Sequence, residues 1–277
     1  MKLNRILIRV DAGGITGTGH VMRMIALAQA YLRRGGSVSM VSVNCPDRLV
    51  ERVHSHGIEH YFINAAHSGN SDDAVLLARD DAENHLQYAQ PFLEAGIPVY
   101  IDKPLALTRK DGEILMGLES WEGQIFSCSA LYFADELKCS LGELKRQVGK
   151  LQNVVARTPK SWEKYAVHIV EPIIRTIGHE FLLVECKRLI NGKSTHVSFC
   201  TDTGLMVQLL ATGWANTGIM IDYIGDKGTV TKTFRDAFPA FKSALESFID
   251  QVRTKEIQIP RAHTRKVVGI LELGMRV

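Results

Sequence analysis

The sequence lacks an excess of charge of either sign. Its 277 residues include 33 Lys and Arg against 30 Asp and Glu, a formal net charge of +3. Binding to a nucleic-acid backbone requires clustered basic residues, and no segment is dominated by them, so we expect no nucleic-acid partner. Apolar residues make up 45% and charged residues 23%, which excludes a disordered, collagen-like or coiled-coil chain.

Long apolar runs are also absent. A helix that spans a bilayer needs about 20 consecutive apolar residues, and the longest stretches here are far shorter. Near the N-terminus, Arg9 and Asp11 interrupt the apolar run, so we expect neither a membrane partner nor a signal peptide. The five cysteines form no Cys-x-x-Cys pair, which is typical of reduced thiols in a cytoplasmic protein.

Two kinds of site motif are missing as well. No Gly-x-Ser-x-Gly sequence occurs, and no cysteine lies in a nucleophile motif. Four histidines are close in sequence (His54, His56, His60 and His67), but His54 and His56 would point to different sides of a helix. We therefore expect no metal site.

The first hundred residues alternate between short apolar strands and amphipathic helices. Strands are expected at residues 5–10, 37–43, 60–63, 74–78 and 99–101. Helices are expected between them, ending before Gly35-Gly36, at 46–56 and at 82–95. This alternation predicts a parallel, doubly wound sheet over about residues 4–104.

After Pro104 the pattern changes to that of an α+β domain. Helices are expected at 108–118, at 164–177 and around 241–252, and strands at 124–131, 151–157, 181–190, 194–202, 206–211 and 219–224. The later strands predict a mostly antiparallel, open sheet. Their alternation should leave one face apolar, and a second subunit usually covers such a face, so we expect a homodimer or higher homo-oligomer.

The glycine-rich turn after the first strand is a candidate phosphate site. Backbone N–H groups at a helix N-terminus bind anions, and the turn reads Gly14-x-x-Gly17-x-Gly19 where dinucleotide-binding folds carry G-x-G-x-x-G. An ordinary tight turn would look much the same. The acidic residue expected after the second strand is missing, and Asn44 with Arg48 suits a 2′-phosphate better than a bare ribose.

His20 follows this turn at the start of a helix, as either a proton acceptor or a capping residue. Arg9-Val-Asp11 followed by Gly17-Thr-Gly19-His20-Val-Met-Arg23 resembles the start of the nucleotide-sugar hydrolases of pseudaminic acid biosynthesis. That resemblance covers about residues 4–73. It implies that His20 is a catalytic base.

The rest of the chain, about residues 73–277, resembles the Gfo/Idh/MocA oxidoreductases. The resemblance rests on Ile101-Asp-Lys-Pro104, where the family has Glu-Lys-Pro, and on further segments that include His85, Trp162–Glu171 and Phe241–Phe248. It implies NAD or NADP as cofactor, with His85 and Pro104 in the cofactor site. It also implies that Lys103 meets the substrate hydroxyl, His168 relays the proton and Glu171 takes the acidic position usually filled by Asp.

Elementary chemistry agrees with the last three assignments. An alcohol oxidised by hydride transfer loses its proton to a base, while a nearby cation stabilises the alkoxide. His168 and Glu171 are three residues apart, so they share one face of a helix. A surface lysine and a histidine at the edge of the core are the simpler alternative.

The predicted fold class is α/β. We expect a Rossmann-like nucleotide-binding domain of hybrid origin over residues 1–122, followed by an α+β substrate and dimerisation domain over 123–277. The absence of a G-x-G-x-x-G motif counts against cofactor binding. The segment Arg79-Asp80-Asp81-Ala82 also counts against it, because it replaces the family's Thr-Pro-Asn and its paired aspartates would repel a pyrophosphate.

Three hypotheses follow. The leading one is a cytoplasmic NAD(P)-dependent oxidoreductase that acts on a sugar, a nucleotide sugar or a cyclitol. The second is a nucleotide-sugar hydrolase that uses His20. The third is a non-catalytic relative that has lost cofactor binding.

Overall fold

The computed structural model describes residues 5–12, 19–62 and 74–275. The chain divides into two compact units. Unit 1 comprises Met1–Ala106, Lys110–Ser127 and Leu245–Ile259, and unit 2 comprises Leu107–Arg109, Cys128–Ala244 and Pro260–Val277. Within the described ranges, no helix is both long enough and apolar enough to cross a membrane.

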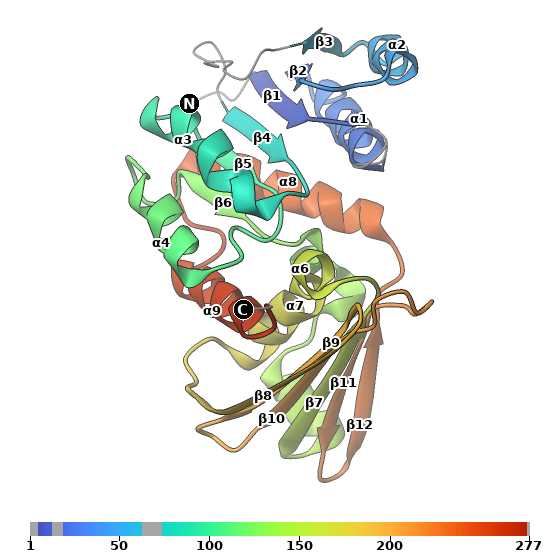
Figure 1. The fold of residues 1–277 in the computed structure, drawn as a ribbon, viewed down its shortest axis with the longest axis vertical. Helices are drawn as coiled ribbons and strands as arrows, with labels where there is room; N and C mark the ends of the chain where they lie inside the picture. Colours follow the sequence, from blue (N-terminus) through green and yellow to red (C-terminus); the bar gives the residue numbers. More distant parts are fainter. Residues whose placement is uncertain (1–4, 13–18, 63–73, 276–277) are drawn as a thin grey trace. The chain divides into compact units, whose positions relative to one another are not determined.

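Unit 1 contains a six-stranded sheet in the order β3-β2-β1-β4-β5-β6, with all neighbouring strands parallel (Figure 1). Its strands are β1 (Arg5–Val10), β2 (Ser37–Ser42), β3 (Glu59–Phe62), β4 (Ala74–Ala78), β5 (Val99–Ile101) and β6 (Ile125–Ser127). Its helices are α1 (Gly19–Leu32), α2 (Asp47–Ser55), α3 (His85–Glu94) and most of α4 (Arg109–Gly117). The expected Rossmann-like parallel sheet is confirmed.

The central strands are buried because their sequences are apolar on both faces. All five residues of β4 are buried, and so are the last five of β1. Such uninterrupted apolar runs are typical of parallel strands covered by helices on both sides. The strand order reverses between β1 and β4, and open α/β sheets bind their ligands at the carboxyl ends of the strands beside such a reversal.

Unit 2 contains a second six-stranded sheet in the order β12-β11-β7-β10-β9-β8. Only β7 and β10 pair in parallel there, so the expected mostly antiparallel sheet is confirmed. Its strands are β7 (Leu151–Thr158), β8 (Leu183–Asn191), β9 (Ser194–Thr201), β10 (Met206–Ala211), β11 (Met220–Gly225) and β12 (Gly228–Thr233). The helices of this unit are α5 (Leu141–Val148), α6 (Trp162–Tyr165), α7 (Val167–Ile177) and α9 (Arg261–Leu273), while α8 (Ala237–Thr254) has residues in both units.

Two of the expected elements are each divided into two elements in the structure, while several others differ by a few residues at their ends. The strand expected at 124–131 ends at Ser127, and a 3₁₀ helix, Ala130–Phe133, follows it. The chain turns there because the Ser129 hydroxyl accepts a hydrogen bond from the Leu131 amide and caps that helix. The single helix expected at 164–177 is instead α6 followed by α7.

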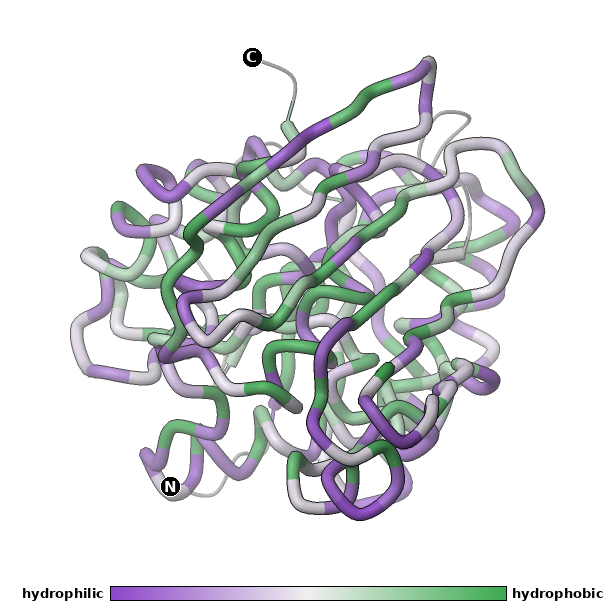
Figure 2. Tube along the Cα trace, turned by 90° about the horizontal axis from the view of Figure 1, so that it is seen from below, coloured by the Kyte–Doolittle hydropathy of each residue, from purple (hydrophilic) through white to green (hydrophobic). Residues whose placement is uncertain are grey.

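The second sheet has one buried face and one mixed face. Alternate residues of β9 are buried: Thr195, Val197, Phe199 and Thr201. The opposite face carries His196 and Ser198 on β9 and the partly exposed Met206 and Leu210 on β10, so hydrophilic and hydrophobic residues are interspersed over the sheet (Figure 2). This face is less apolar than the sequence predicts, and its cover by a second subunit stays a prediction.

Gly225, at the end of β11, has no room for a side chain. A Cβ atom there would collide with the carbonyl oxygens of Val148 and Lys150, which are backbone atoms and cannot rotate away. We expect Gly225→Ala to lower the free energy of unfolding by about 2 kcal/mol, measured by urea denaturation. Gly218→Ala is the matched control, because a Cβ at Gly218 meets nothing within 4 Å. Equal stability of the two variants would contradict the packing argument.

Candidate functional site

A charged cluster lies at the carboxyl ends of β4 and β5. The side chain of Lys103, just after β5, is only 10% exposed; its ammonium donates a hydrogen bond to Asp80 at 3.1 Å and lies 3.8 Å from the Asp102 carboxylate. Burial acts to lower the pKa of Lys103, but the two carboxylates outweigh burial and raise it. Lys103 is therefore a cation at neutral pH, suited to stabilise negative charge on a substrate oxygen.

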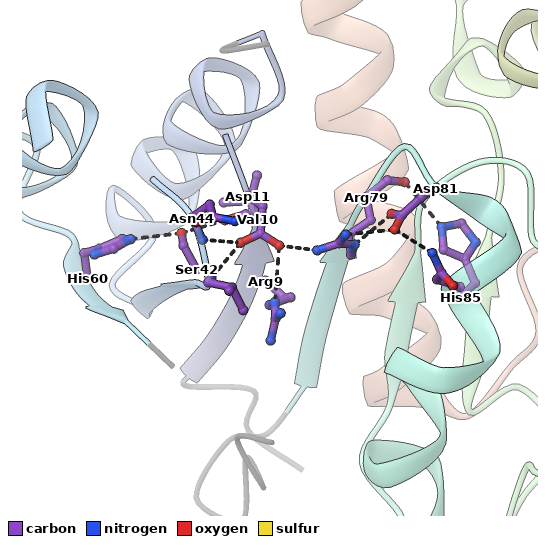
Figure 3. Close-up of polar contacts among 11 residues, drawn as sticks. Arg9, Val10, Asp11, Ser42, Asn44, His60, Arg79, Asp81 and His85 are labelled. Carbon is purple, nitrogen blue, oxygen red and sulfur yellow. Dashed lines mark hydrogen bonds and ion pairs between the residues drawn. The ribbon is translucent and has the colours of Figure 1, made fainter. Parts of the chain in front are cut away.

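A second charged network joins the ends of β1 and β4, at the reversal of strand order. Arg79 pairs with Asp11, and it forms a two-pronged pair with Asp81 at 2.7 and 2.8 Å (Figure 3). Asp11 also accepts hydrogen bonds from the backbone amides of Val43 and Asn44 after β2, at 2.6 and 3.1 Å. One carboxylate thus links the ends of three strands.

Arg9 lies beside this network and is 6% exposed. Its Nε has no hydrogen-bond partner among the described residues and lies 3.8 Å from the Asp11 carboxylate. Burial lowers the pKa of Arg9, although Asp11 acts in the opposite direction. The guanidinium groups of Arg9 and Arg79 lie 5.7 and 4.3 Å from the centre of the Tyr88 ring, close enough for cation–π attraction. Two cations are therefore held against one aromatic face.

These pairings answer the objection that two neighbouring aspartates would repel a pyrophosphate. Asp80 is paired with Lys103, and Asp81 with Arg79, so each of the two neighbouring carboxylates has a cationic partner. At the end of β2, Asn44 and Arg48 are exposed and can reach a ribose or its phosphate. The donors that this sheet edge offers an anionic ligand are therefore the exposed Asn44 and Arg48 and the Arg9 Nε, which has no hydrogen-bond partner among the described residues.

The predicted phosphate turn is described only at its end. Gly14 and Gly17 lie outside the described residues, whereas Gly19 and His20 are the first two residues of α1. A helix that begins there places its N-terminus next to the turn, as phosphate binding requires. The roles assigned to these glycines and to His20 stay predictions.

His85 and Pro104 were assigned to the cofactor site from the resemblance. His85 is fully buried, and its two ring nitrogens each lie 3.3 Å from a backbone carbonyl oxygen, that of Leu105 and that of Arg79 (Figure 3 shows the ring beside Asp81). The ring therefore connects the segments that carry Arg79 and Lys103. Pro104 is buried and follows a cis peptide bond. Direct contact of either residue with a cofactor stays a prediction.

The second candidate cluster belongs to unit 2, where α7 presents two polar residues to Ser129. The Ser129 hydroxyl oxygen lies 2.6 Å from His168 Nδ1, and the Ser129 amide donates to Glu171 at 2.5 Å. The Tyr165 ring meets the His168 ring edge to face, with centres 5.0 Å apart. The expectation that His168 and Glu171 share one helix face is confirmed by their common partner.

Glu171 differs from a charged catalytic carboxylate. It is buried, and burial raises its pKa well above the usual value, against the smaller effect of the Ser129 amide. Burial thus favours the neutral form of the Glu171 carboxyl group.

Ser129 is the residue that the sequence alone does not single out. Its contacts join residues 39 and 42 positions away, so no local spacing reveals them. The pairing of Asp11 with Arg79 is hidden in the same way, since the two residues are 68 positions apart. In the described part of the chain, no three His, Cys, Asp or Glu side chains are placed to hold a metal ion. His67 lies outside that part.

Comparison with known proteins gives one partial sequence match. No family model matches the chain. The curated protein Oxidoreductase P35 of Formosa agariphila is 28% identical over 105 residues, which are 37% of this chain and 32% of that protein. The match therefore spans about a third of the relative's length.

Solved structures match almost the whole chain. A 3-ketoreductase from Actinomadura kijaniata in complex with NADP has a TM-score of 0.78 and 14% identity, over 97% of this chain and 96% of that one. A myo-inositol dehydrogenase from Corynebacterium glutamicum has a TM-score of 0.73 and 13% identity, over 98% of this chain and 94% of that one. An apo scyllo-inositol dehydrogenase from Lactobacillus casei has a TM-score of 0.73 and 16% identity, over 99% of this chain and 97% of that one. The chain has the fold of these dehydrogenases.

The same matches bear on the first segment of the chain. Because they cover 97% to 99% of the chain, the dehydrogenase fold also includes most of residues 4–73. The comparisons give no support to the resemblance of that segment to nucleotide-sugar hydrolases. A strand, a glycine turn and a helix start, as around His20, also occur in dinucleotide-binding folds.

The pairing of Asp81 predicts a pH-dependent contribution to stability. Burial acts to raise the pKa of Asp81, but hydrogen bonds from Arg79 and Asn84 outweigh it and lower the pKa. A folded-state pKa below the unfolded value stabilises the fold above the unfolded pKa, and this contribution is lost as the pH falls through the folded one. We expect Asp81→Asn to melt below the wild type at pH 7, and the gap to close below about pH 4.

The control for this prediction is Asp250→Asn. The Asp250 side chain is exposed and has no hydrogen bond or ion pair with any described residue. Melting temperatures followed by circular dichroism between pH 7 and pH 3, as a rough working range, give the comparison. A gap for Asp81→Asn that stays constant with pH would show that the carboxylate charge is not the cause.

Proposed function

We propose that the protein is an NAD(P)-dependent oxidoreductase of the Gfo/Idh/MocA type, acting on a hydroxyl group of a sugar, a nucleotide sugar or a cyclitol. The observation that carries the proposal is Lys103, a buried cation held by Asp80 and Asp102 at the carboxyl end of β5 in a chain with a dehydrogenase fold. Inositol dehydrogenases and a ketoreductase among the similar structures support this substrate class.

The residues of the two clusters take different roles in this proposal. Lys103 is charged, so it donates a hydrogen bond to the substrate oxygen and stabilises negative charge there. His168 holds or receives the proton of that hydroxyl, because histidine is the side chain best suited to exchange a proton near neutral pH. Glu171 accepts the hydrogen bond of the Ser129 amide and so helps to fix Ser129.

The cofactor, when bound, supplies or accepts the hydride. We assign its phosphates to the turn with Gly14, Gly17 and Gly19, and its adenosine ribose to Asn44 and Arg48. Arg48 lies in the first turn of α2 and is exposed, so a 2′-phosphate can reach its guanidinium.

Cofactor binding is the first test. We expect NADPH to quench the fluorescence of the protein with a Kd well below about 1 mM, and Arg48→Ala to weaken NADPH by about 10-fold while leaving NADH nearly unchanged. Arg52→Ala is the matched control, since Arg52 lies on the same helix four residues later. If neither cofactor binds in the submillimolar range, the oxidoreductase proposal fails.

Substitution of the two cluster residues is the second test. In a substrate screen that has found activity, we expect Lys103→Met and His168→Ala each to lower kcat by about 100-fold or more, because each loses a charge-stabilising or proton-transferring group. Lys110→Ala, at an exposed position on α4, should be neutral. His20→Ala should then reduce mainly cofactor affinity.

The opposite pattern would identify a different enzyme. If His20→Ala abolishes turnover, while Lys103→Met only raises KM, the reaction depends on the first turn of α1. That outcome would favour hydrolysis of a nucleotide sugar over hydride transfer.

A further inference from the structure

Lys160 has a backbone conformation that few lysines adopt. Its φ is 63°, in the left-handed region that is unfavourable for a residue with a Cβ atom. Lys255 is the other non-glycine residue with positive φ in the described part of the chain, and it directly follows α8, where helix ends commonly adopt this conformation. Lys160 ends no helix, since it lies two residues after β7. Backbone strain of this kind is concentrated at functional sites.

The segments on both sides of Lys160 hold it in this conformation. The Gly213 amide, after β10, donates a hydrogen bond to the Lys160 carbonyl oxygen at 2.9 Å. The amide and the hydroxyl of Thr212 both donate to the carbonyl oxygen of Thr158, at 2.9 and 3.1 Å. Trp162 is buried, and its indole N–H donates to a backbone carbonyl of α9 at 2.7 Å. The fold therefore fixes a position that suits glycine, yet the sequence has lysine there.

The Lys160 side chain lies against Tyr165. Its ammonium donates a hydrogen bond to the Tyr165 hydroxyl at 2.5 Å and lies 4.4 Å from the centre of the ring, within the range of cation–π attraction. The Tyr165 ring in turn meets the His168 ring edge to face, with centres 5.0 Å apart. One phenol ring thus separates the ammonium from the imidazole, a spacing that a single sugar with one substituent can bridge.

The positive charge of Lys160 is not neutralised by the described part of the chain. No carboxylate there forms an ion pair with it, and its side chain contacts recorded in the structure are those with Tyr165. A lysine ammonium has three N–H donors, and the Tyr165 hydroxyl accepts one of them. Lys160 is exposed and Tyr165 partly exposed, so a ligand can reach the other two donors. A carboxylate or phosphate oxygen satisfies both the donors and the charge.

We propose that Lys160 is a specificity-determining residue, which binds a carboxylate or phosphate group carried by the sugar substrate. Tyr165 is the residue that holds the ammonium beside His168. The inference rests on the function proposed above, because it takes His168 to mark the substrate site. It narrows the substrate class from sugars and cyclitols in general to those with a negatively charged substituent.

Three probes that share one sugar ring test the preference for charge. D-glucose, D-glucuronate and D-glucose 6-phosphate differ in one substituent, which is neutral, a carboxylate or a phosphate. We expect a charged probe to bind the wild type with a Kd about 10-fold below that of glucose, measured by saturation-transfer NMR. The preference should shrink at about 0.5 M salt, because salt screens an exposed charge. Which charged probe binds more tightly identifies the anionic group.

Substitutions at Lys160 assign the preference to its charge. Lys160→Met should abolish the preference, while Lys160→Arg should keep most of it. Lys145→Met is the matched control, since Lys145 is an exposed lysine on α5 and should not alter the binding of any probe. Equal Kd values for the three probes in the wild type would overturn the proposal. So would a preference that persists in Lys160→Met, or a wild type that binds none of the probes.

Lys160→Gly separates a binding role from a structural one. Glycine adopts a φ of 63° without strain. If the lysine is present for its charge, this variant should lose the preference for charged probes, while its melting temperature stays at or above that of the wild type. A melting temperature below that of the wild type would show that the side chain serves the stability of the fold through Tyr165, and would overturn the proposal.

These binding measurements require neither cofactor nor turnover, so they separate the inference from the proposed function. A protein that binds no nicotinamide cofactor, but has a charge preference that depends on Lys160, would refute the oxidoreductase and leave the anion site standing. An active oxidoreductase with equal KM values for charged and neutral sugars, unchanged in Lys160→Met, would refute the anion site alone.

Discussion

Two cations at the carboxyl edge of the first sheet, Lys103 and Arg79, are each held by two carboxylates. Moving an ammonium or guanidinium group out of water is unfavourable unless a carboxylate faces it, and removal of one partner of a buried pair costs about 3–5 kcal/mol. Asp80 and Asp102 form ion pairs with Lys103, while Asp11 and Asp81 form ion pairs with Arg79. In the sequence, the adjacent Asp80 and Asp81 count against cofactor binding. In the structure they stabilise the buried cations of Lys103 and Arg79.

The sequence predicts well the strands that are apolar on both faces and the helices that end at a glycine. β1 and β4 are uninterrupted apolar runs, and the glycines at 57 and 96 follow α2 and α3 with φ near 71° and 75°. β12 escaped prediction because this edge strand reads GTVTKT, without buried apolar residues. α5 carried a readable signal, the capping box of Ser140 and Glu143.

The candidate site was predictable only where chemistry is carried by residue type. Lys103 and His168 were suggested by the resemblance to the Gfo/Idh/MocA oxidoreductases, and their residue types agree, because few side chains can hold a charge or exchange a proton. Ser129 gave no such signal, since a serine is common and its role depends on contacts with α7 that are distant in sequence. Burial is a further property that the sequence does not show, and it raises the pKa of Glu171.

The pKa values of Lys103 and Glu171, one in each cluster, are both raised, but for different reasons. Two carboxylates raise the pKa of Lys103, whereas burial raises the pKa of Glu171 against the smaller effect of the Ser129 amide. The first shift favours a charged group and the second favours a neutral one. Histidine is the side chain whose ordinary pKa lies near neutral pH. In the proposed oxidoreductase, proton exchange is therefore assigned to His168, whose ring contacts Ser129.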